Sequence, residues 1–147
     1  MRQGQTLAGF PLRLAGLFYD VFISGSVVLI AGFAYLPVTG GEAPMPGTWA
    51  GAGFQLFILA VLYLFFVGFW THGGRTLGML AWSLRLIDPD GNRPGLKRAS
   101  LRFAACLLSW ATLGLGFAWA LIDPHNRALH DRLAGTWLVR EHGAGGA

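Results

Sequence analysis

Charge and cysteine are both scarce in this sequence of 147 residues, and each shortage narrows the class of protein. Only 12% of the residues are charged, whereas soluble domains contain about a quarter. Most of the surface must therefore face something other than water. The single cysteine, Cys106, excludes a disulfide within the chain, so the redox compartment cannot be inferred from cysteine usage.

Apolar and aromatic residues are abundant instead. Hydrophobic residues make up 54% of the chain, with six Trp and eleven Phe, a composition typical of membrane interfaces. Three apolar segments stand out, at residues 14–36, 50–70 and 103–122. The first is long enough to cross about 30 Å of hydrocarbon as a helix, and Pro37 closes it. It is interrupted by Asp20, so we interpret it as a retained anchor and not as a cleaved signal.

The loops differ in positive charge, which predicts an orientation. Residues 37–49 contain no Lys or Arg, whereas the 71–102 loop is strongly basic. The positive-inside rule places the N-terminus and the 71–102 loop in the cytoplasm of a bacterial inner membrane protein. Because these basic residues flank apolar runs, they suit anionic lipids near the 71–102 loop and do not indicate nucleic acid binding.

The third segment, 103–122, is compatible with two arrangements. It contains Gly114 and Gly116, and paired glycines weaken a helix. The segment is either one tilted span with glycines at a packing interface, or a broken hairpin that enters and returns on the same side. The first places the C-terminal tail outside, and the second keeps it in the cytoplasm.

Two stretches outside the spans predict further structure. TLGMLAWSL predicts a short amphipathic helix, and the partly alternating residues 82–88 predict a strand that pairs with a second strand at 135–140. The expected fold is an all-α membrane protein with two to three transmembrane helices and a small β-hairpin on the cytoplasmic side. Residues 1–140 form one domain, and residues 141–147 are expected to be a disordered tail.

Asp20 is the costliest residue in the first span, because a carboxylate inside a bilayer must find a partner. Arg13 lies seven residues earlier, on nearly the same helix face and about 10 Å away along the axis. Asp20 is either a proton or cation site, with Ser24 one turn deeper as a second oxygen ligand, or a buried polar group that fixes helix packing.

A second polar cluster, HNRALHDRLAGT, follows the third segment and contains His130, Asp131 and Arg132. Its two histidines are five residues apart, which is not the spacing of a helical metal pair. We therefore expect no metal site and no cofactor, and the sequence contains no nucleophile–base pattern that favours an enzyme.

Three stretches together resemble the RDD family of bacterial membrane proteins: RLAGLFYD, GRTLGM with the loop after it, and ALHDRLAGTWLV. The resemblance extends from about Pro11 to Val139, and LHDRLAGT is its most specific motif. It implies that the arginine and two aspartates of the family name are Arg13, Asp20 and Asp131, with Asp88 as the other candidate for the last. The family usually carries a basic residue after TLG, where this chain has Met79 and Leu80.

The resemblance implies a membrane protein with a suggested link to transport, since some members resemble cation/proton exchange proteins. Our leading hypothesis is a cation- or proton-coupled transport role, with Asp20 titrating, Arg13 holding that carboxylate, and Asp131 as a surface relay or partner of Arg13. The alternative is a structural, assembly or partner-binding protein in which the charges only lock helices together. Three helices enclose little space, so we expect a homo-oligomer or a partner membrane subunit.

Overall fold

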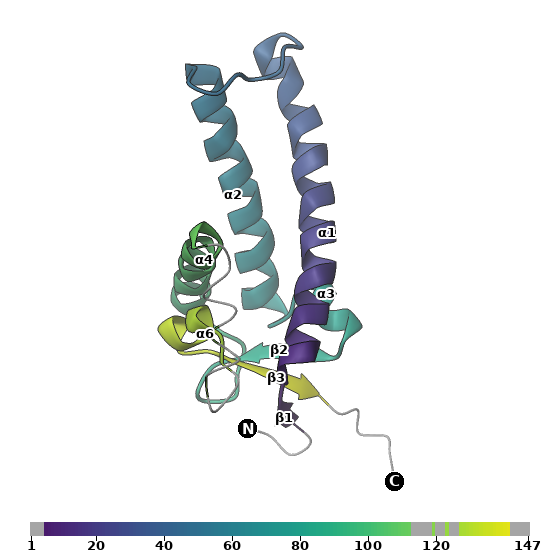
Figure 1. The fold of residues 1–147 in the computed structure, drawn as a ribbon, viewed down its shortest axis with the longest axis vertical. Coiled ribbons are helices and arrows are strands. Elements are labelled where there is room, and N and C mark those ends of the chain that lie inside the picture. The colour runs from purple at the N-terminus through teal and green to yellow at the C-terminus, as the bar shows by residue number, and fades with distance from the viewer. Residues whose placement is uncertain (1–4, 113–118, 120–122, 124–126, 142–147) are drawn as a thin grey trace.

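The computed structural model describes residues 5–112, 119, 123 and 127–141 (Figure 1). Two long helices, α1 (Phe10–Tyr35) and α2 (Trp49–His72), extend side by side from a small base. The base contains a three-stranded sheet, the short helices α3 (Leu77–Ala81) and α6 (Leu129–Ala134), and the start of α4 (Leu96–Ala111).

Both long helices begin and end where the sequence provides the signals. Pro11 lies in the first turn of α1, where its missing N–H costs no hydrogen bond. A short 3-10 helix, η1 (Leu36–Thr39), contains Pro37 and leads to Gly40 in the left-handed conformation. Thr48 caps α2 by accepting a hydrogen bond from the backbone N–H of Gly51 at 3.0 Å.

Residues Phe10–Thr39 and Trp49–His72 are long and apolar enough to cross a membrane. Their large apolar side chains are largely exposed along most of their length, Phe22, Ile30 and Leu64 among them. Such surfaces suit contact with lipid. The predicted segments 14–36 and 50–70 therefore correspond to two helices, with boundaries shifted by a few residues.

The sheet has one strand more than the predicted hairpin. Strand β3 (Trp137–Glu141) lies between β1 (Gln5–Leu7) and β2 (Leu84–Ile87), and both neighbours pair with it antiparallel. The predicted pairing of residues 82–88 with 135–140 is confirmed in the register Leu86↔Leu138. Strand β1 was not predicted, because three residues before a helix carry too short a pattern to recognise.

This sheet joins the beginning, middle and end of the chain. Thr6 and Leu84 pair with Arg140 from opposite sides. The N-terminal segment, the basic loop and the tail therefore lie at one end of the molecule, while the 40–48 connection lies at the other (Figure 1). Glu141, assigned to the disordered tail from sequence, belongs to β3, and residues 142–147 lie outside the described residues.

The third apolar segment is described only in its first half. Helix α4 begins at Leu96, seven residues before the apolar run, and ends at Ala111. Gly114 and Gly116, with most of the segment's second half, lie outside the described residues. The main core lies between the sheet and the nearby ends of α2 and α4, and includes Trp70, Leu84, Leu86, Phe103 and Leu138.

Candidate functional site

Helix α6 contains Asp131, the most deeply buried charged residue among those that the structure describes. This helix has only six residues, and Gly135, in the left-handed conformation, ends it. The backbone N–H of Thr136 then donates to the Asp131 carbonyl at 2.9 Å, which turns the chain into β3. Asp131 is 0% exposed, so the specific motif LHDRLAGT folds into a compact turn around a buried carboxylate.

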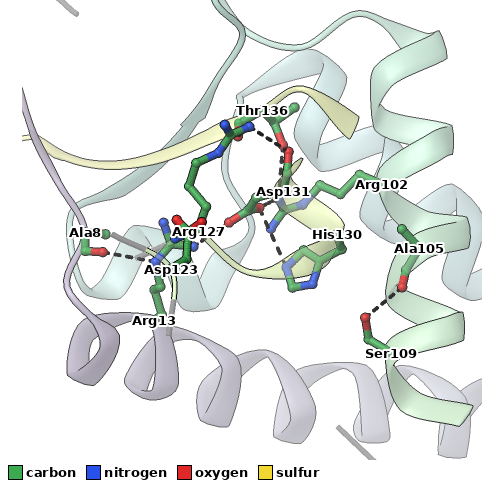
Figure 2. A network of polar contacts seen from close by, with 10 residues as sticks. All are labelled: Ala8, Arg13, Arg102, Ala105, Ser109, Asp123, Arg127, His130, Asp131 and Thr136. Carbon is green, nitrogen blue, oxygen red and sulfur yellow. Dashed lines mark hydrogen bonds and ion pairs between the residues drawn. The ribbon is translucent and has the colours of Figure 1, made fainter. Parts of the chain in front are cut away.

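Two arginines from different helices meet this carboxylate (Figure 2). Arg13 of α1 donates from Nη1 to Oδ2 of Asp131 at 2.5 Å, and Arg102 of α4 donates from Nη1 to Oδ1. Their side chains are only 9% and 4% exposed. One buried anion thus joins three segments, and removing Asp131 would leave two buried cations without their shared partner.

Further bonds orient both arginines. The Nε of Arg13 donates to the Ala8 carbonyl at 3.0 Å, just after β1. The Nη1 of Arg102 also donates to the Thr136 hydroxyl at 3.2 Å, and its guanidinium lies 5.0 Å from the centre of the Trp70 ring.

An outer group of charges supports the α6 turn. Arg127 donates to the carbonyls of Asp131 and Thr136, both at 3.2 Å, and stacks 3.9 Å from the centre of the Trp137 ring. Asp123 accepts from the Arg127 backbone N–H at 2.9 Å and from Arg132 at 3.1 Å.

Asp20 belongs to a separate contact between α1 and α3. Its carboxylate accepts from the Thr76 hydroxyl at 2.5 Å and from the Gly78 backbone N–H at 2.9 Å. Thr76 in turn accepts from the backbone N–H of Met79 at 3.2 Å, which caps α3. Asp20 is 5% exposed. From within α1 its carboxylate accepts a hydrogen bond from a backbone N–H in the first turn of α3, a group that has no acceptor inside its own helix.

A close approach of glycines makes this contact possible. A Cβ atom on Gly78 would lie 2.5 Å from the Gly16 carbonyl oxygen and 2.7 Å from Oδ1 of Asp20. Any side chain at position 78 would push α3 away from α1. The GRTLGM motif therefore supplies both the hydroxyl and the bare backbone that Asp20 requires.

The arrangement differs from the expected one at Arg13 and Asp131. We expected Arg13 to hold the Asp20 carboxylate, but Arg13 binds Asp131, because the sheet and α6 bring Asp131 to the first turn of α1. The expected partnership of Asp131 with Arg13 is present, whereas its expected place at the surface is wrong, since it is buried.

The other candidate residues lie around these contacts. The Ser24 hydroxyl donates to the Val21 carbonyl of its own helix at 3.2 Å. Arg132 is half exposed and binds Asp123. His130 is buried with Nε2 at 3.7 Å from Oδ1 of Asp131. Burial lowers the pKa of His130 well below its usual 6.5, and the positive charges of Arg102 and Arg13 lower that pKa further. Its imidazole is therefore neutral near pH 7.

A cavity of about 560 Å³ lies beside both contacts, between α1, α2 and α4. Its wall is mainly apolar, and its members with charged or polar groups include Arg13, Asp20, Ser24, Trp70, Arg102 and His130. Among the residues that the structure describes, no three His, Cys, Asp or Glu side chains gather as a metal site would require.

Sequence reasoning missed Arg102, Thr76 and Gly78 as members of the site. Arg102 was counted with the basic loop, although its place beside an apolar run is a signal for burial. Thr76 precedes a predicted helix, which is a cap position. Their partners, Asp131 and Asp20, are 29 and 56 residues away in the chain, which local patterns cannot reveal.

Comparison with known proteins gives two matches. A family model described as the RDD family matches residues 7–135. An uncharacterized protein, RP437, of Rickettsia prowazekii (strain Madrid E) is 33% identical over 92 residues, which cover 59% of this chain and 51% of that protein. The chain thus spans about half the length of this curated relative. No solved structure matches.

Proposed function

Because the chain belongs to the RDD family, we propose that it is a structural or partner-binding protein of the membrane, in which the family's charged residues lock the helices together. It carries out no catalysis in this proposal and needs no cofactor. Arg13, Asp20 and Asp131 hold α1 to the base, and the apolar faces of α1 and α2 remain available to lipid and to other membrane subunits.

The observation that carries this proposal is the bonding of Asp20. Both of its oxygens accept short hydrogen bonds, one from Thr76 and one from Gly78. A carboxylate that takes up and releases a cation must exchange its partners, whereas this one caps a helix that would otherwise leave buried N–H groups unpaired. The cost of a carboxylate in a membrane-spanning helix is thus offset by a bond between two elements.

The same proposal includes an orientation. The strongly basic loop and the absence of Lys and Arg from residues 37–49 support a cytoplasmic N-terminus in a bacterial inner membrane. Because β3 pairs with β1 and β2, the tail shares that side. Helix α4 packs against α6, so these two described helices belong to the same part of the molecule.

The partners in this proposal are other membrane components. Exposed apolar side chains along α1 and α2 favour a second copy of the chain or a different membrane subunit. The cations of the 71–102 loop favour anionic lipid head groups at the membrane surface.

A double-mutant cycle tests the lock. Asp20→Asn and Thr76→Val should each lower the melting temperature in detergent. The decrease in the double variant should be clearly smaller than the sum of the two single decreases, because both changes remove the same hydrogen bond. The exposed Asp90→Asn is the matched control and should melt like the wild type. An Asp20→Asn variant as stable as the wild type would reject the locking role.

Transport remains the second candidate, because Asp20 and Ser24 both line the cavity. In that case Asp20→Asn should keep its melting temperature and oligomeric state, yet abolish cation- or pH-dependent flux in proteoliposomes. Thr76→Val, which keeps the carboxylate, should retain flux. Absence of flux from wild-type vesicles for every cation tested would reject transport.

A further inference from the structure

The cavity is shaped for a long apolar ligand. Residues from Phe10 to Val28 of α1 line it, a run of about 27 Å at 1.5 Å per residue. Its 560 Å³ lies within the range of small-molecule sites, about 300–1,000 Å³. The facing wall contains Leu62 and Phe66 of α2 and Leu107 and Trp110 of α4.

Exposed apolar side chains line the cavity on both α1 and α4. Helix α1 packs against α2 and α3, whereas α4 packs against α2 and α6. The lining residues Leu14 and Val21 of α1, and Leu107 and Trp110 of α4, are exposed. The cavity therefore borders the apolar surfaces that suit contact with lipid.

Three residues that line the cavity carry hydrogen-bond donors without acceptors among the described residues. Three buried nitrogens on its lining residues find no acceptor in the part of the chain that the structure describes: Arg13 Nη2, Arg102 Nε and Trp70 Nε1. All three residues are more than nine-tenths buried. A buried donor without an acceptor is destabilising, and all three would be satisfied by oxygen atoms.

We propose that this cavity binds an anionic phospholipid of the surrounding bilayer, with an acyl chain along α1 and phosphate oxygens at Arg13, Arg102 and Trp70. The chain of one leaflet occupies about 15 Å, half of a hydrocarbon core of about 30 Å, which the 27 Å run accommodates together with part of a head group. Arg13 lies in the first turn of α1, the level at which lipid phosphates lie.

The charge balance favours an anion. Arg13 and Arg102 share the single carboxylate of Asp131, which leaves this cluster with one more positive than negative charge, while Asp20 lies seven residues further along α1, about 10 Å away along the axis. Guanidinium groups also suit phosphate oxygens geometrically. The inference goes beyond the locking role, since it assigns a ligand to the cavity and not a task to the charges that fold it.

Lipid titration tests the proposal. Delipidated protein in detergent is titrated with phosphatidylglycerol, with phosphatidylcholine of the same acyl chains, and with inorganic phosphate, and binding is followed by native mass spectrometry and thermal unfolding. We expect phosphatidylglycerol to bind at least tenfold more tightly than phosphatidylcholine and to raise the melting temperature, and phosphate alone to do neither. Equal binding of the two lipids, or a shift by phosphate alone, would overturn the proposal.

Substitutions at two glycines test whether the lipid occupies this cavity. Gly25 lines the cavity in α1, and a Cβ atom there meets no atom within 4 Å. Gly68 of α2 has equally open space but does not line the cavity. Gly25→Leu should fill the cavity and weaken phosphatidylglycerol binding at least tenfold, whereas Gly68→Leu should bind like the wild type.

Both variants leave the charged base intact, so their melting temperatures without lipid should stay close to that of the wild type. Wild-type affinity in Gly25→Leu would place the lipid elsewhere. This failure is distinguishable from failure of the locking role, which is measured on Asp20 and Thr76 without added lipid.

Discussion

At the scale of single residues, the buried charges decide the stability of the base. Asp131 pairs with two arginines, Arg13 and Arg102. Arg13 also donates to the Ala8 carbonyl, and Arg102 also donates to the Thr136 hydroxyl. Asp20 is held by neutral donors only, a hydroxyl and a backbone N–H. These two aspartates therefore act differently: Asp131 joins helices through charge, and Asp20 caps a helix through hydrogen bonds.

Replacing Arg102 with Leu should destabilise the protein strongly. The change removes a buried cation that binds both Asp131 and Thr136. Breaking a buried pair from one side typically costs about 3–5 kcal/mol, and we expect a loss near the lower end of that range because Arg13 still pairs with Asp131. Equilibrium unfolding in mixed micelles measures the loss. Arg98→Leu is the control: its side chain is 40% exposed and lies 3.7 Å from Asp88, so it should change the free energy of unfolding by less than about 1 kcal/mol. Equal effects of the two variants would contradict the buried network.

His130 should make stability depend on pH. Its folded pKa lies well below 6.5, because burial and the charges of Arg102 and Arg13 disfavour the imidazolium. Between the two pKa values the unfolded chain binds more protons than the folded protein, so stability falls as pH drops below about 6.5. Melting temperatures between about pH 7.5 and 5.5 measure this slope.

Replacing His130 with glutamine distinguishes its contribution to the pH dependence of stability from the contributions of other titrating groups. His130→Gln should flatten the pH dependence, whereas His72→Gln, a change at an exposed histidine at the end of α2, should retain it. If both variants lose stability as steeply as the wild type, another group is responsible for the slope.

At the scale of elements, close approach and strand pairing hold α1 to the rest of the molecule. Helix α3 approaches α1 closely at Gly78, where a Cβ atom would lie 2.5 Å from the Gly16 carbonyl oxygen. Strand β1 precedes α1 by two residues, so it fixes the direction in which the helix leaves the base. Both contacts are made by short segments whose own sequence patterns are weak.

Gly78→Ala should separate α3 from α1. The added methyl group would lie 2.5 Å from the Gly16 carbonyl oxygen, and a backbone atom cannot move aside as a flexible side chain can. We expect a lower melting temperature. Gly68→Ala in α2 adds the same methyl group into open space and should be neutral or stabilising by up to about 1 kcal/mol. A fully stable Gly78→Ala variant would show that the approach is looser than described.

A disulfide between strands tests the unexpected β1. Thr6 and Arg140 are direct partners in the β1–β3 pair, where Cα atoms lie about 4.5–5.5 Å apart, within reach of a disulfide. With Cys106 replaced by alanine, Thr6→Cys with Arg140→Cys should cross-link under mild oxidation, as seen by gel mobility. Thr6→Cys with Arg85→Cys should not, because β3 separates those strands. Cross-linking in the second pair alone would mean a different strand order.

At the scale of the whole molecule, polar and apolar structure are separated along one axis. The sheet, α3 and α6 lie at the base, and the two long helices extend from it to the 40–48 connection (Figure 1). A membrane around α1 and α2 leaves these two ends on opposite sides.

Impermeant labelling measures that separation. In a chain without Cys106, Thr48→Cys should react with a membrane-impermeant maleimide in intact cells. Asp90→Cys, in the basic loop, should react only after lysis, because the proposed orientation places the loop with Lys and Arg in the cytoplasm. Reversed labelling would invert the orientation, and labelling of both from outside would exclude two spans.

The sequence by itself determined the elements that depend on neighbouring residues. Apolar length predicted α1 and α2, the stretch TLGMLAWSL predicted α3, and partial alternation predicted β2, with residues 135–140 as the expected partner strand β3. The match to the RDD family is likewise carried by local motifs, and comparison confirmed it. Helical length and side-chain period are properties of short stretches, so they can be read without the fold.

Only the tertiary structure decided which charge meets which. Arg13 and Asp20 share a helix face in the sequence, yet Arg13 binds Asp131, which is 118 residues away, and Asp20 binds the start of α3. A buried carboxylate binds whichever donors the packed backbone brings to it, because leaving it unpaired in a dry interior costs more free energy than any local preference supplies. That choice depends on strand β1, on the Gly16–Gly78 approach and on the turn at Gly135, none of which a pattern in one segment determines.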